Sequence, residues 1–368
     1  MRKCFRRAYA AVALMLLVAG ALAAAALAAG RAAPTVVATG FDSPRGLAFA
    51  PNGTLYVAEA GHGGDVCDPE ACLGLTSQIS AVDVATGAHR PVVTGLISSN
   101  DLVHGGVTGV DGISVREGRI LGIITEYPQG VPPDSTCAAG PPDCLAVLAA
   151  ARAQLGTLIR ATPAGEWKTV AGVGAFDFEW TAAHQGPDQV EIDANPYGVL
   201  GVPGGAWVAD SGSNTLDFVS ANGTTSVVAH FPNPPAGTLF PADAVPTCVV
   251  ISHDKLYVGD LSGRLWTVNG STPTRVPIRG DLGKHITGCA ADAAGNLYLV
   301  NIFTTPFPSP GTGNVVKLAT NGTASVIAGP LNFPNGIVVG PDGGIYVSVN
   351  SVCPATGPCQ GQVVRLNP

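Results

Sequence analysis

The chain has 368 residues, of which only 12% are charged, and its formal net charge is −7. Proteins that bind nucleic acid or an anionic membrane surface need clustered basic side chains, so this composition excludes both as predicted partners. The 48 glycines and 30 prolines are typical of a turn-rich β protein. The length ordinarily indicates two domains, unless one repetitive fold accounts for it.

The first 30 residues have the pattern of an export signal. A basic start, MRKCFRR, precedes an apolar stretch at 8–27 and a run of small alanines. This pattern predicts a secretory signal peptide at 1–30, cleaved near 28–33, and a single secreted domain at 31–368 with no membrane contact after cleavage. The apolar stretch is also long enough to be an uncleaved membrane anchor, and that alternative stays open.

The stretch PRGLAFAPNGTLYVAE at 44–59 returns in altered form along the chain. Each copy reads as a β-hairpin, and the copies begin at residues 44, 110, 196, 246, 287 and 334. A second hairpin follows most copies, which gives four antiparallel strands per unit of about 40–50 residues. We therefore predict an all-β, six-bladed β-propeller. Two β-sandwiches joined by a linker are the alternative, but they do not explain the shared phrase.

The two ends of the repeat array complement one another. The sixth unit ends with QVVRLNP and lacks a fourth strand, whereas TVVAT at 35–39 precedes the first copy and resembles the outer strands of other units. We predict that this N-terminal strand closes the last blade and removes an open sheet edge. The expected oligomeric state is a monomer.

Nine cysteines are present, and all but Cys4 lie beyond the predicted signal peptide. An even number of cysteines in an exported protein predicts disulfides. The expected pairs are Cys67 with Cys72, Cys137 with Cys144, Cys353 with Cys359, and Cys248 with Cys289. We assign the last pair to one shared repeat position, where other copies have glycine, so its bridge would join the fourth blade to the fifth. A zinc site is the alternative, but these spacings form no coherent zinc pattern.

The long insertions are expected on one face of the ring. The turns inside the repeated hairpins are short, whereas the segments that connect hairpins are long at 60–77, 127–156, 173–195, 302–313 and 351–361. We call the face with these insertions the looped face and the other the hairpin face. Function concentrates on loops held by a rigid scaffold, so we predict that the looped face is the working surface. A short helix in CLAVLAAARAQLG is expected to pack over it. The alternative is that this face merely tolerates insertions.

Acidic and amide residues recur where the second strand of each copy ends on the looped face. They are Glu59, Glu126, Asp210, Asp260 and Asn301, with Asn350 one place beyond the aligned position in the sixth copy. The starts of the first strands add Arg45, Asp111, Tyr197, Thr247 and Asn335. A ring of such oxygens at a channel mouth can hold one divalent cation such as Ca²⁺, and Glu59, Asp210, Asp260 and Asn301 are the candidate ligands. The alternative is that each of them ties the next turn through side-chain-to-backbone hydrogen bonds.

The chain has no G-x-S-x-G, H-E-x-x-H or Walker sequence, so the catalytic residues remain unassigned and no organic cofactor is indicated. The repeats resemble those of NHL-type propellers, and the chain over 35–368 is similar to the ScyD/ScyE family of exported proteins. The similarity is carried by FDSPRGLAFAPNGTLYVAEAG, VTGVDGISV, EIDANPYGVL, DAVPTCVV and NFPNGIVVGPDGGIYVS. It implies a six-bladed propeller and export, but no particular reaction.

Two functions are compatible with these features. The first is a secreted binding or scaffold protein that presents the looped face to a small molecule, a glycan or a protein. The second is a divalent-metal-dependent hydrolase of lactones or esters, because the repeats also resemble gluconolactonases, in which a metal-bound water could attack a lactone. The lack of a catalytic motif favours the first function.

Overall fold

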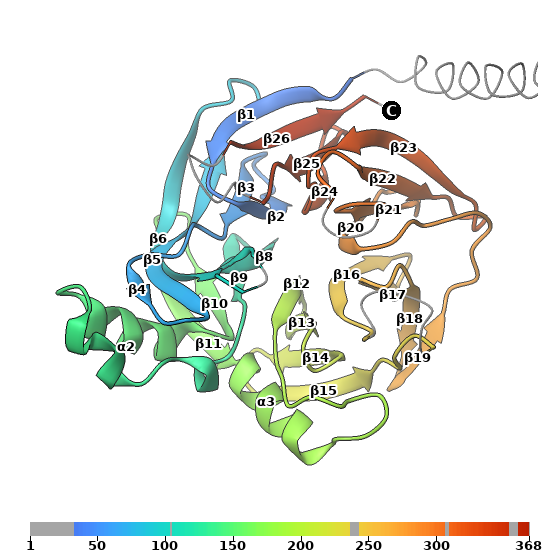
Figure 1. Cartoon of the computed structure of the whole chain (residues 1–368). Helices are drawn as coiled ribbons and strands as arrows, with labels where there is room; N and C mark the ends of the chain where they lie inside the picture. The colour runs from blue at the N-terminus through green and yellow to red at the C-terminus, as the bar shows by residue number, and fades with distance from the viewer. Residues whose placement is uncertain (1–32, 104, 236–242, 306–308, 353–359, 368) are drawn as a thin grey trace, which may run out of the picture.

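The computed structural model describes residues 33–103, 105–235, 243–305, 309–352 and 360–367. Its strands form six antiparallel sheets arranged as a ring around a central channel, so the predicted six-bladed propeller is confirmed (Figure 1). Each blade contains four main strands, and the innermost strand of each blade lines the channel.

The strands follow the chain from blade to blade, beginning with the first copy of the repeat. Blade 1 contains β2 (Pro44–Phe49), β3 (Leu55–Glu59), β5 (Ala71–Val82) and β6 (His89–Asp101), with the short β4 (Val66–Cys67) and β7 (Val107–Thr108). Blade 2 contains β8 (Val110–Arg116), β9 (Arg119–Ile124), β10 (Thr157–Ala161) and β11 (Trp167–Gly172). Blade 3 contains β12 (Pro196–Val202), β13 (Gly205–Asp210), β14 (Thr215–Ser220) and β15 (Thr225–His230).

The remaining blades complete the ring. Blade 4 contains β16 (Pro246–Ser252), β17 (Lys255–Asp260), β18 (Leu265–Asn269) and β19 (Thr272–Arg275). Blade 5 contains β20 (Ile286–Ala291), β21 (Leu297–Asn301), β22 (Gly313–Leu318) and β23 (Ala324–Leu331). Blade 6 contains β24 (Ile337–Val339), β25 (Ile345–Val349), β26 (Gly361–Leu366) and the N-terminal β1 (Thr35–Phe41).

The N-terminal strand closes the ring as predicted. β1 pairs antiparallel with β26, from Thr35 opposite Arg365 to Phe41 opposite Gly361. Phe41 is fully buried in an apolar cluster that joins blade 6 to blade 1. The first and last described strands thus share one sheet, in which β1 covers the edge of β26 that would otherwise be unpaired.

Glycine near the start of the innermost strands lets neighbouring blades approach closely. A Cβ at Gly112 would lie 2.3 Å from the carbonyl oxygen of Tyr197, and one at Gly336 would lie 2.3 Å from that of Arg45. Blade 4 has Cys248 at this place, and it forms a disulfide with Cys289 of blade 5. The predicted pair is therefore present, but its assumed alignment is wrong by one residue. The pairing register places Gly288, not Cys289, at the position equivalent to Cys248.

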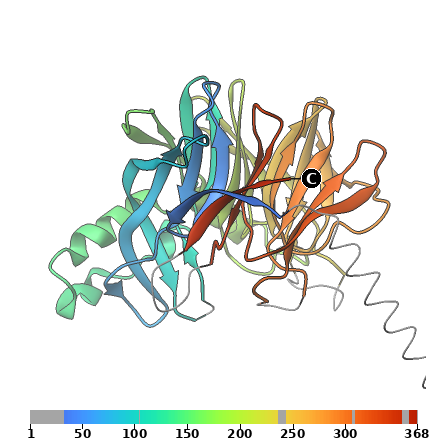
Figure 2. The same ribbon diagram turned by 90° about the horizontal axis from the view of Figure 1, so that it is seen from above.

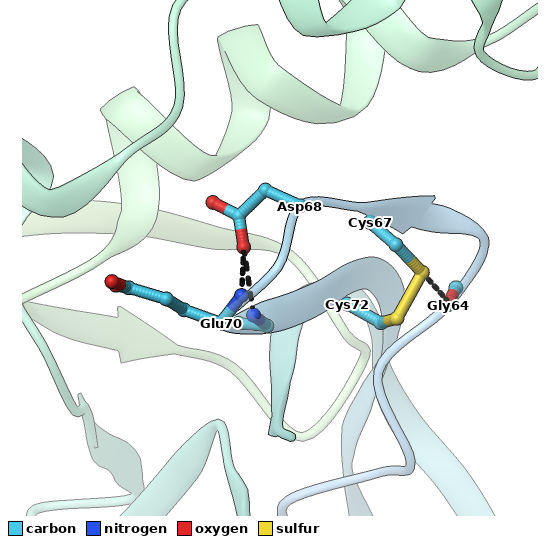
Figure 3. Close-up of a disulfide and its surroundings, with 6 residues drawn as sticks. Gly64, Cys67, Asp68, Glu70 and Cys72 are labelled. Carbon is cyan, nitrogen blue, oxygen red and sulfur yellow. Dashed lines mark hydrogen bonds between the residues drawn. A yellow bond between two sulfur atoms is a disulfide. The ribbon is translucent and has the colours of Figure 1, made fainter. Parts of the chain in front are cut away.

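Two further predicted disulfides stabilise insertions. Cys67–Cys72 joins β4 to β5 at the tip of blade 1, where Asp68 also accepts two backbone N–H bonds (Figure 3). Cys137–Cys144 joins the 3-10 helix η2 (Asp134–Ala139) to the start of α2 (Cys144–Gln154). The predicted pair Cys353–Cys359 and the predicted signal peptide lie outside the described residues.

The insertions contain more regular structure than the sequence indicated. β4 and the first part of β5 lie in the segment 60–77, which was expected to be a loop. The predicted helix exists as α2, but it packs against the outer strands β5 and β6 at the edge of the ring rather than over the channel (Figures 1 and 2). The segment after blade 2 contains an unpredicted helix, α3 (Val173–Ala183), and 127–156 also includes the 3-10 helix η1 (Pro128–Gly130). No helix among the described residues is long and apolar enough to span a membrane.

Candidate functional site

The innermost strands of the blades line a central cavity of about 280 Å³. At its looped end lies one residue from each blade, namely the residue that precedes Gly46, Gly112, Gly198, Cys248, Gly288 or Gly336. These residues are Arg45, Asp111, Tyr197, Thr247, Thr287 and Asn335. Two of them, Thr247 and Thr287, donate hydrogen bonds to backbone carbonyls of the next blade. The other four contact one another in pairs.

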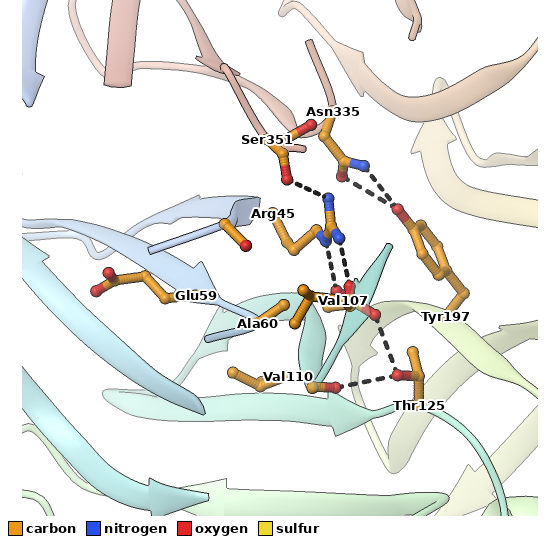
Figure 4. Close-up of polar contacts among 12 residues, drawn as sticks. Arg45, Glu59, Ala60, Val107, Val110, Thr125, Tyr197, Asn335 and Ser351 are labelled. Carbon is orange, nitrogen blue, oxygen red and sulfur yellow. Dashed lines mark hydrogen bonds and ion pairs between the residues drawn. The ribbon is translucent and has the colours of Figure 1, made fainter. Parts of the chain in front are cut away.

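A buried ion pair lies at this mouth of the channel. The Arg45 Nε donates to Oδ1 of Asp111 at 2.8 Å, and its other nitrogens donate to the carbonyl oxygens of Val107 and Ser351 (Figure 4). Thr125 donates to the second carboxylate oxygen of Asp111 at 3.1 Å. Burial raises the pKa of Asp111, and the Arg45 guanidinium opposes that shift. Arg45 therefore connects blades 1, 2 and 6, with all of its nitrogen atoms engaged.

A second contact crosses the channel from blade 3 to blade 6. The Asn335 amide donates to the Tyr197 hydroxyl at 2.8 Å (Figure 4). Burial raises the pKa of Tyr197 to about 12, so the phenol stays protonated at neutral pH. This contact and the ion pair engage four of the six side chains at the mouth with one another.

The candidate ligand Glu59 points into its own blade. It accepts hydrogen bonds from Ser80, from the Gln78 amide at 2.9 Å and from the backbone N–H of Asp42 at 2.7 Å. Burial raises the pKa of Glu59, and these hydrogen bonds oppose the shift. All of these partners belong to blade 1 or to the turn beside it.

Asp260, like Glu59, accepts hydrogen bonds from residues of its own blade, which is blade 4. Its oxygens accept hydrogen bonds from Ser262 at 2.6 Å, Arg264 Nε at 2.8 Å and Trp266 Nε1 at 2.9 Å. Burial raises the pKa of Asp260, and Arg264 is the strongest opposing influence. Asn301 likewise donates within blade 5, to the Leu282 carbonyl and to the Asn314 side chain.

Asp210 ties the loops of blade 3 together. Its Oδ1 accepts backbone N–H bonds from Asn195 at 2.8 Å and from Gly212 and Ser213 at 2.9 Å. Its Oδ2 meets no donor. The four candidate ligands are thus each engaged in a separate blade, and the alternative role of tying turns describes their contacts.

These positions do not fit one shared divalent ion. Among the described residues, no group of three or more His, Cys, Asp or Glu side chains could hold a metal. The two remaining face candidates differ from the ring. Asn350, at φ 55°, donates to the Gln360 carbonyl, and the backbone N–H of Glu126, at φ 69°, donates to Oδ1 of Asn195.

An acidic cavity of about 230 Å³ lies on the looped face beside blade 3. Its lining includes Glu191, Asp193, Asn195, Asn214 and Asp243. Burial raises the pKa of Asp193 to about 6, and nearby carboxylates add to the shift. Burial, followed by the Asp193 carboxylate, raises the pKa of Glu126 to about 7. The negative charge here therefore grows as the pH rises through neutrality.

No family model and no curated protein matches the sequence. Several solved structures have a similar fold. A gluconolactonase from Xanthomonas campestris is 10% identical over 92% of this chain and 96% of its own, with a TM-score of 0.52. A candidate glucose dehydrogenase from Thermus thermophilus is 13% identical over 91% of this chain and 99% of its own, with a TM-score of 0.52.

A protein of unknown function from Bacteroides thetaiotaomicron has a TM-score of 0.53 at 12% identity, covering 89% of this chain and 70% of its own. At these identities the similarity shows the propeller fold alone. No specific function follows from the fold.

The two faces of the propeller carry opposite charge. On the looped face the carboxylates that are not buried are Asp42, Asp65, Asp68, Glu70, Asp101, Glu126, Asp134, Asp143, Glu179, Asp188, Glu191, Asp193, Asp243 and Asp281. Against them stand two cationic side chains outside the core among the described residues, Arg152 and Lys284.

On the hairpin face the balance is reversed. Its cations are Arg90, Arg116, Arg119, Arg160, Lys168, Lys255, Arg279, Lys317 and Arg365, whereas Arg275 lies on the outer strand of blade 4 at the end away from the hairpin turn. Its acids are Asp83, Glu117, Glu166, Asp254, Asp292 and Asp342. This separation of charge is not visible along the sequence. It appears only when the strands are placed in their blades.

Large apolar side chains are also exposed on the looped face. Val190 is 68% exposed and Leu145 is 57% exposed. The others on this face are Leu75, Leu102, Val103, Phe176, Ile192 and Val352. Exposed apolar groups bordered by charge are typical of interaction surfaces. The combination distinguishes this face from the hairpin face.

Proposed function

We propose that the chain is an exported binding propeller, similar to the ScyD/ScyE family, which captures a basic protein or peptide on its looped face. The observation that carries this proposal is the separation of charge between the two faces. A carboxylate-rich surface attracts cationic partners over a distance of about one Debye length and orients their approach. The exposed apolar side chains on the same face would then contact the aliphatic portions of the partner.

A divalent-metal-dependent hydrolase of lactones or esters is the second candidate. A gluconolactonase of similar fold supports it at the level of architecture only. The contacts of Glu59, Asp210, Asp260 and Asn301 weigh against it, because each side chain is engaged within its own blade. We therefore place it second and derive no chemical step from it.

The test uses the mature protein and an oligolysine peptide as a defined basic probe. The looped-face variant is Asp188→Asn, Glu191→Gln and Asp243→Asn, next to the acidic cavity. The matched control is Glu117→Gln, Glu166→Gln and Asp254→Asn on the hairpin face, where the removed charge is the same. We expect the looped-face variant to weaken binding by about tenfold and to reduce its salt dependence, with little change in the control. Equal effects of the two variants would contradict the proposal.

The pH dependence gives a second measurement. Asp193 and Glu126 have pKa values of about 6 and about 7, so both become charged as the pH rises from 5 to 8. Affinity for the probe should increase across that range, because a cation binds the ionised forms. Affinity that falls or stays constant between these pH values would argue against binding beside the acidic cavity.

A further inference from the structure

Three buried carboxyl groups meet beneath the looped face of blade 3. Asp177 comes from α3, Asp210 from the end of β13 and Asp217 from β14, and each is 0% exposed. Asp177 lies within hydrogen-bonding distance of both other carboxyl groups. Neither oxygen of Asp177 meets any other donor, and the same holds for Oδ2 of Asp210 and Oδ1 of Asp217. Ionised carboxylates cannot remain side by side in this environment without protons or a cation between them.

The three groups are not equivalent. Asp210 Oδ1 accepts three backbone N–H bonds, which stabilise a carboxylate. Asp217 Oδ2 accepts one bond from the Thr215 hydroxyl at 3.0 Å. Asp177 has no donor at all from the rest of the protein. Any single negative charge in the cluster is therefore best placed on Asp210.

No cation compensates the cluster. The other titratable groups around α3 are Glu179 on the helix, Glu126 and Tyr127 beside η1, Arg160 on β10, His184 and Asp193 after the helix, and His230 at the end of β15. Arg160 lies at the hairpin end of β10, where it lines a separate cavity with Glu166. The main influences on the three carboxyl groups include no cationic side chain. The described residues also provide no metal-binding group here.

We propose that Asp177, Asp210 and Asp217 share two protons, and that this cluster is a latch that holds α3 on the looped face until alkaline pH releases it. One proton lies between Asp177 and Asp210, and the other joins Asp217 to the second oxygen of Asp177. This arrangement satisfies both contacts of Asp177 and leaves one net negative charge, on Asp210.

The direction of the pH dependence follows from burial. Burial and the neighbouring carboxylates raise the pKa values of Asp177 and Asp217 well above the usual range. Once α3 is released, the same groups regain ordinary pKa values, so release is accompanied by loss of protons. Docking is therefore strongest at low pH and weakens as the pH rises through the raised values. The proposal does not depend on the basic partner proposed above.

The test is amide hydrogen exchange of α3 between pH 6 and pH 10, corrected for the intrinsic exchange rates, with β22 of blade 5 as internal reference. Each proton released makes opening of α3 about tenfold more favourable per pH unit, so the cluster predicts a slope of up to two protons. In Asp177→Asn, the amide donates to Asp210 and its oxygen accepts from Asp217, so one proton is no longer needed. The slope should fall by about one proton, with greater protection at alkaline pH.

The matched control is Glu179→Gln, which also replaces a carboxyl group by an amide, at an exposed position of the same helix, and should keep the wild-type slope. If Asp177→Asn fails to fold, Asp217→Asn tests the same loss of one proton. An unchanged slope in the cluster variant would overturn the proposal. So would millimolar Ca²⁺ that restores protection at alkaline pH in the wild type and not in Asp177→Asn, because that result assigns the cluster to a cation.

Discussion

Asp210 and Asp260 occupy the same repeat position in neighbouring blades, yet their surroundings are electrostatically opposite. Each ends the second strand of its blade, is 0% exposed and accepts backbone N–H bonds from the following turn. Asp260 then meets the Arg264 guanidinium and the Trp266 indole, whereas Asp210 meets the Asp177 carboxyl group, which also contacts Asp217. The repeat thus determines the hydrogen bonds between the acid and the backbone of the following turn. The side chains around the acid differ between blades, and they determine the charge of the site.

The pairing register identifies the residue that makes the difference. Trp266 lies opposite Val258 in blade 4, Ser80 lies opposite Val57 in blade 1, and Asp217 lies opposite Val208 in blade 3. Trp266 and Ser80 each donate a hydrogen bond to the strand-end acid. A protonated Asp217 would supply an O–H donor from the same register position, but in the shared-proton cluster it donates to Asp177, and Asp177 in turn donates to Asp210.

The largest expected effect comes from making blade 4 resemble blade 3. Arg264→Leu leaves Asp260 buried without its cation, and breaking a buried ion pair costs about 3–5 kcal/mol of stability. Urea unfolding at pH 7 measures the change, which should diminish at low pH because protonation of Asp260 removes the unpaired charge. The control is Arg365→Leu, which removes an exposed pair with Asp342 and should cost less than about 1 kcal/mol. If Arg264→Leu lowers the free energy of unfolding no more than the control does, the electrostatic difference between Asp260 and Asp210 is contradicted.

A smaller effect of opposite sign is expected in blade 3. Asp177→Asn removes one buried titrating group, so we expect stabilisation on the order of 1–3 kcal/mol at pH 8, by analogy with neutral replacements of buried charges. Near pH 3 the difference should shrink, because aspartates of the unfolded chain are then protonated too and no proton uptake accompanies folding. Thermal or urea unfolding across pH 3–9 measures both. Destabilisation at every pH would show that the carboxyl group contributes something an amide cannot.

The architecture could be predicted from the sequence because each repeat shows alternating apolar and polar residues on both sides of a short turn. The phrase places the innermost strands, and the incomplete sixth unit predicts that β1 pairs with β26. The same reasoning found the Cys248–Cys289 bridge but misaligned Cys289, because ITGCA contains glycine and cysteine side by side and only the register shows which one is equivalent to Cys248.

The candidate site was less predictable, because sequence position fixes where a strand ends but not where its side chain points. Glu59 and Asp210 were placed at the correct end of their strands, but their partners come from outer strands and loops. Asp177 was missed because its helix, VGAFDFEWTAA, has no clear amphipathic pattern. The one available indication was Asp217, an acid in the otherwise apolar strand TLDFVS.

The smallest effect is expected from removing only the donor at the register position that distinguishes the two blades. Trp266→Phe keeps an aromatic ring beneath Arg264, 5.0 Å from the ring centre in the wild type, but removes the indole N–H bond to Asp260. We expect a loss of about 1–2 kcal/mol, the usual cost of a lost hydrogen bond to a charged group. The loss should be greater at pH 8 than at pH 4, because the ionised carboxylate is the form that requires the donor. Trp207→Phe in blade 3, whose indole lies tilted against Phe218 at 4.9 Å between ring centroids, controls for the change in ring size. The control removes no hydrogen bond to a carboxylate, so its stability loss should not depend on pH. The same pH dependence in the control would show that the effect does not come from Asp260, and would contradict the role assigned to the register position.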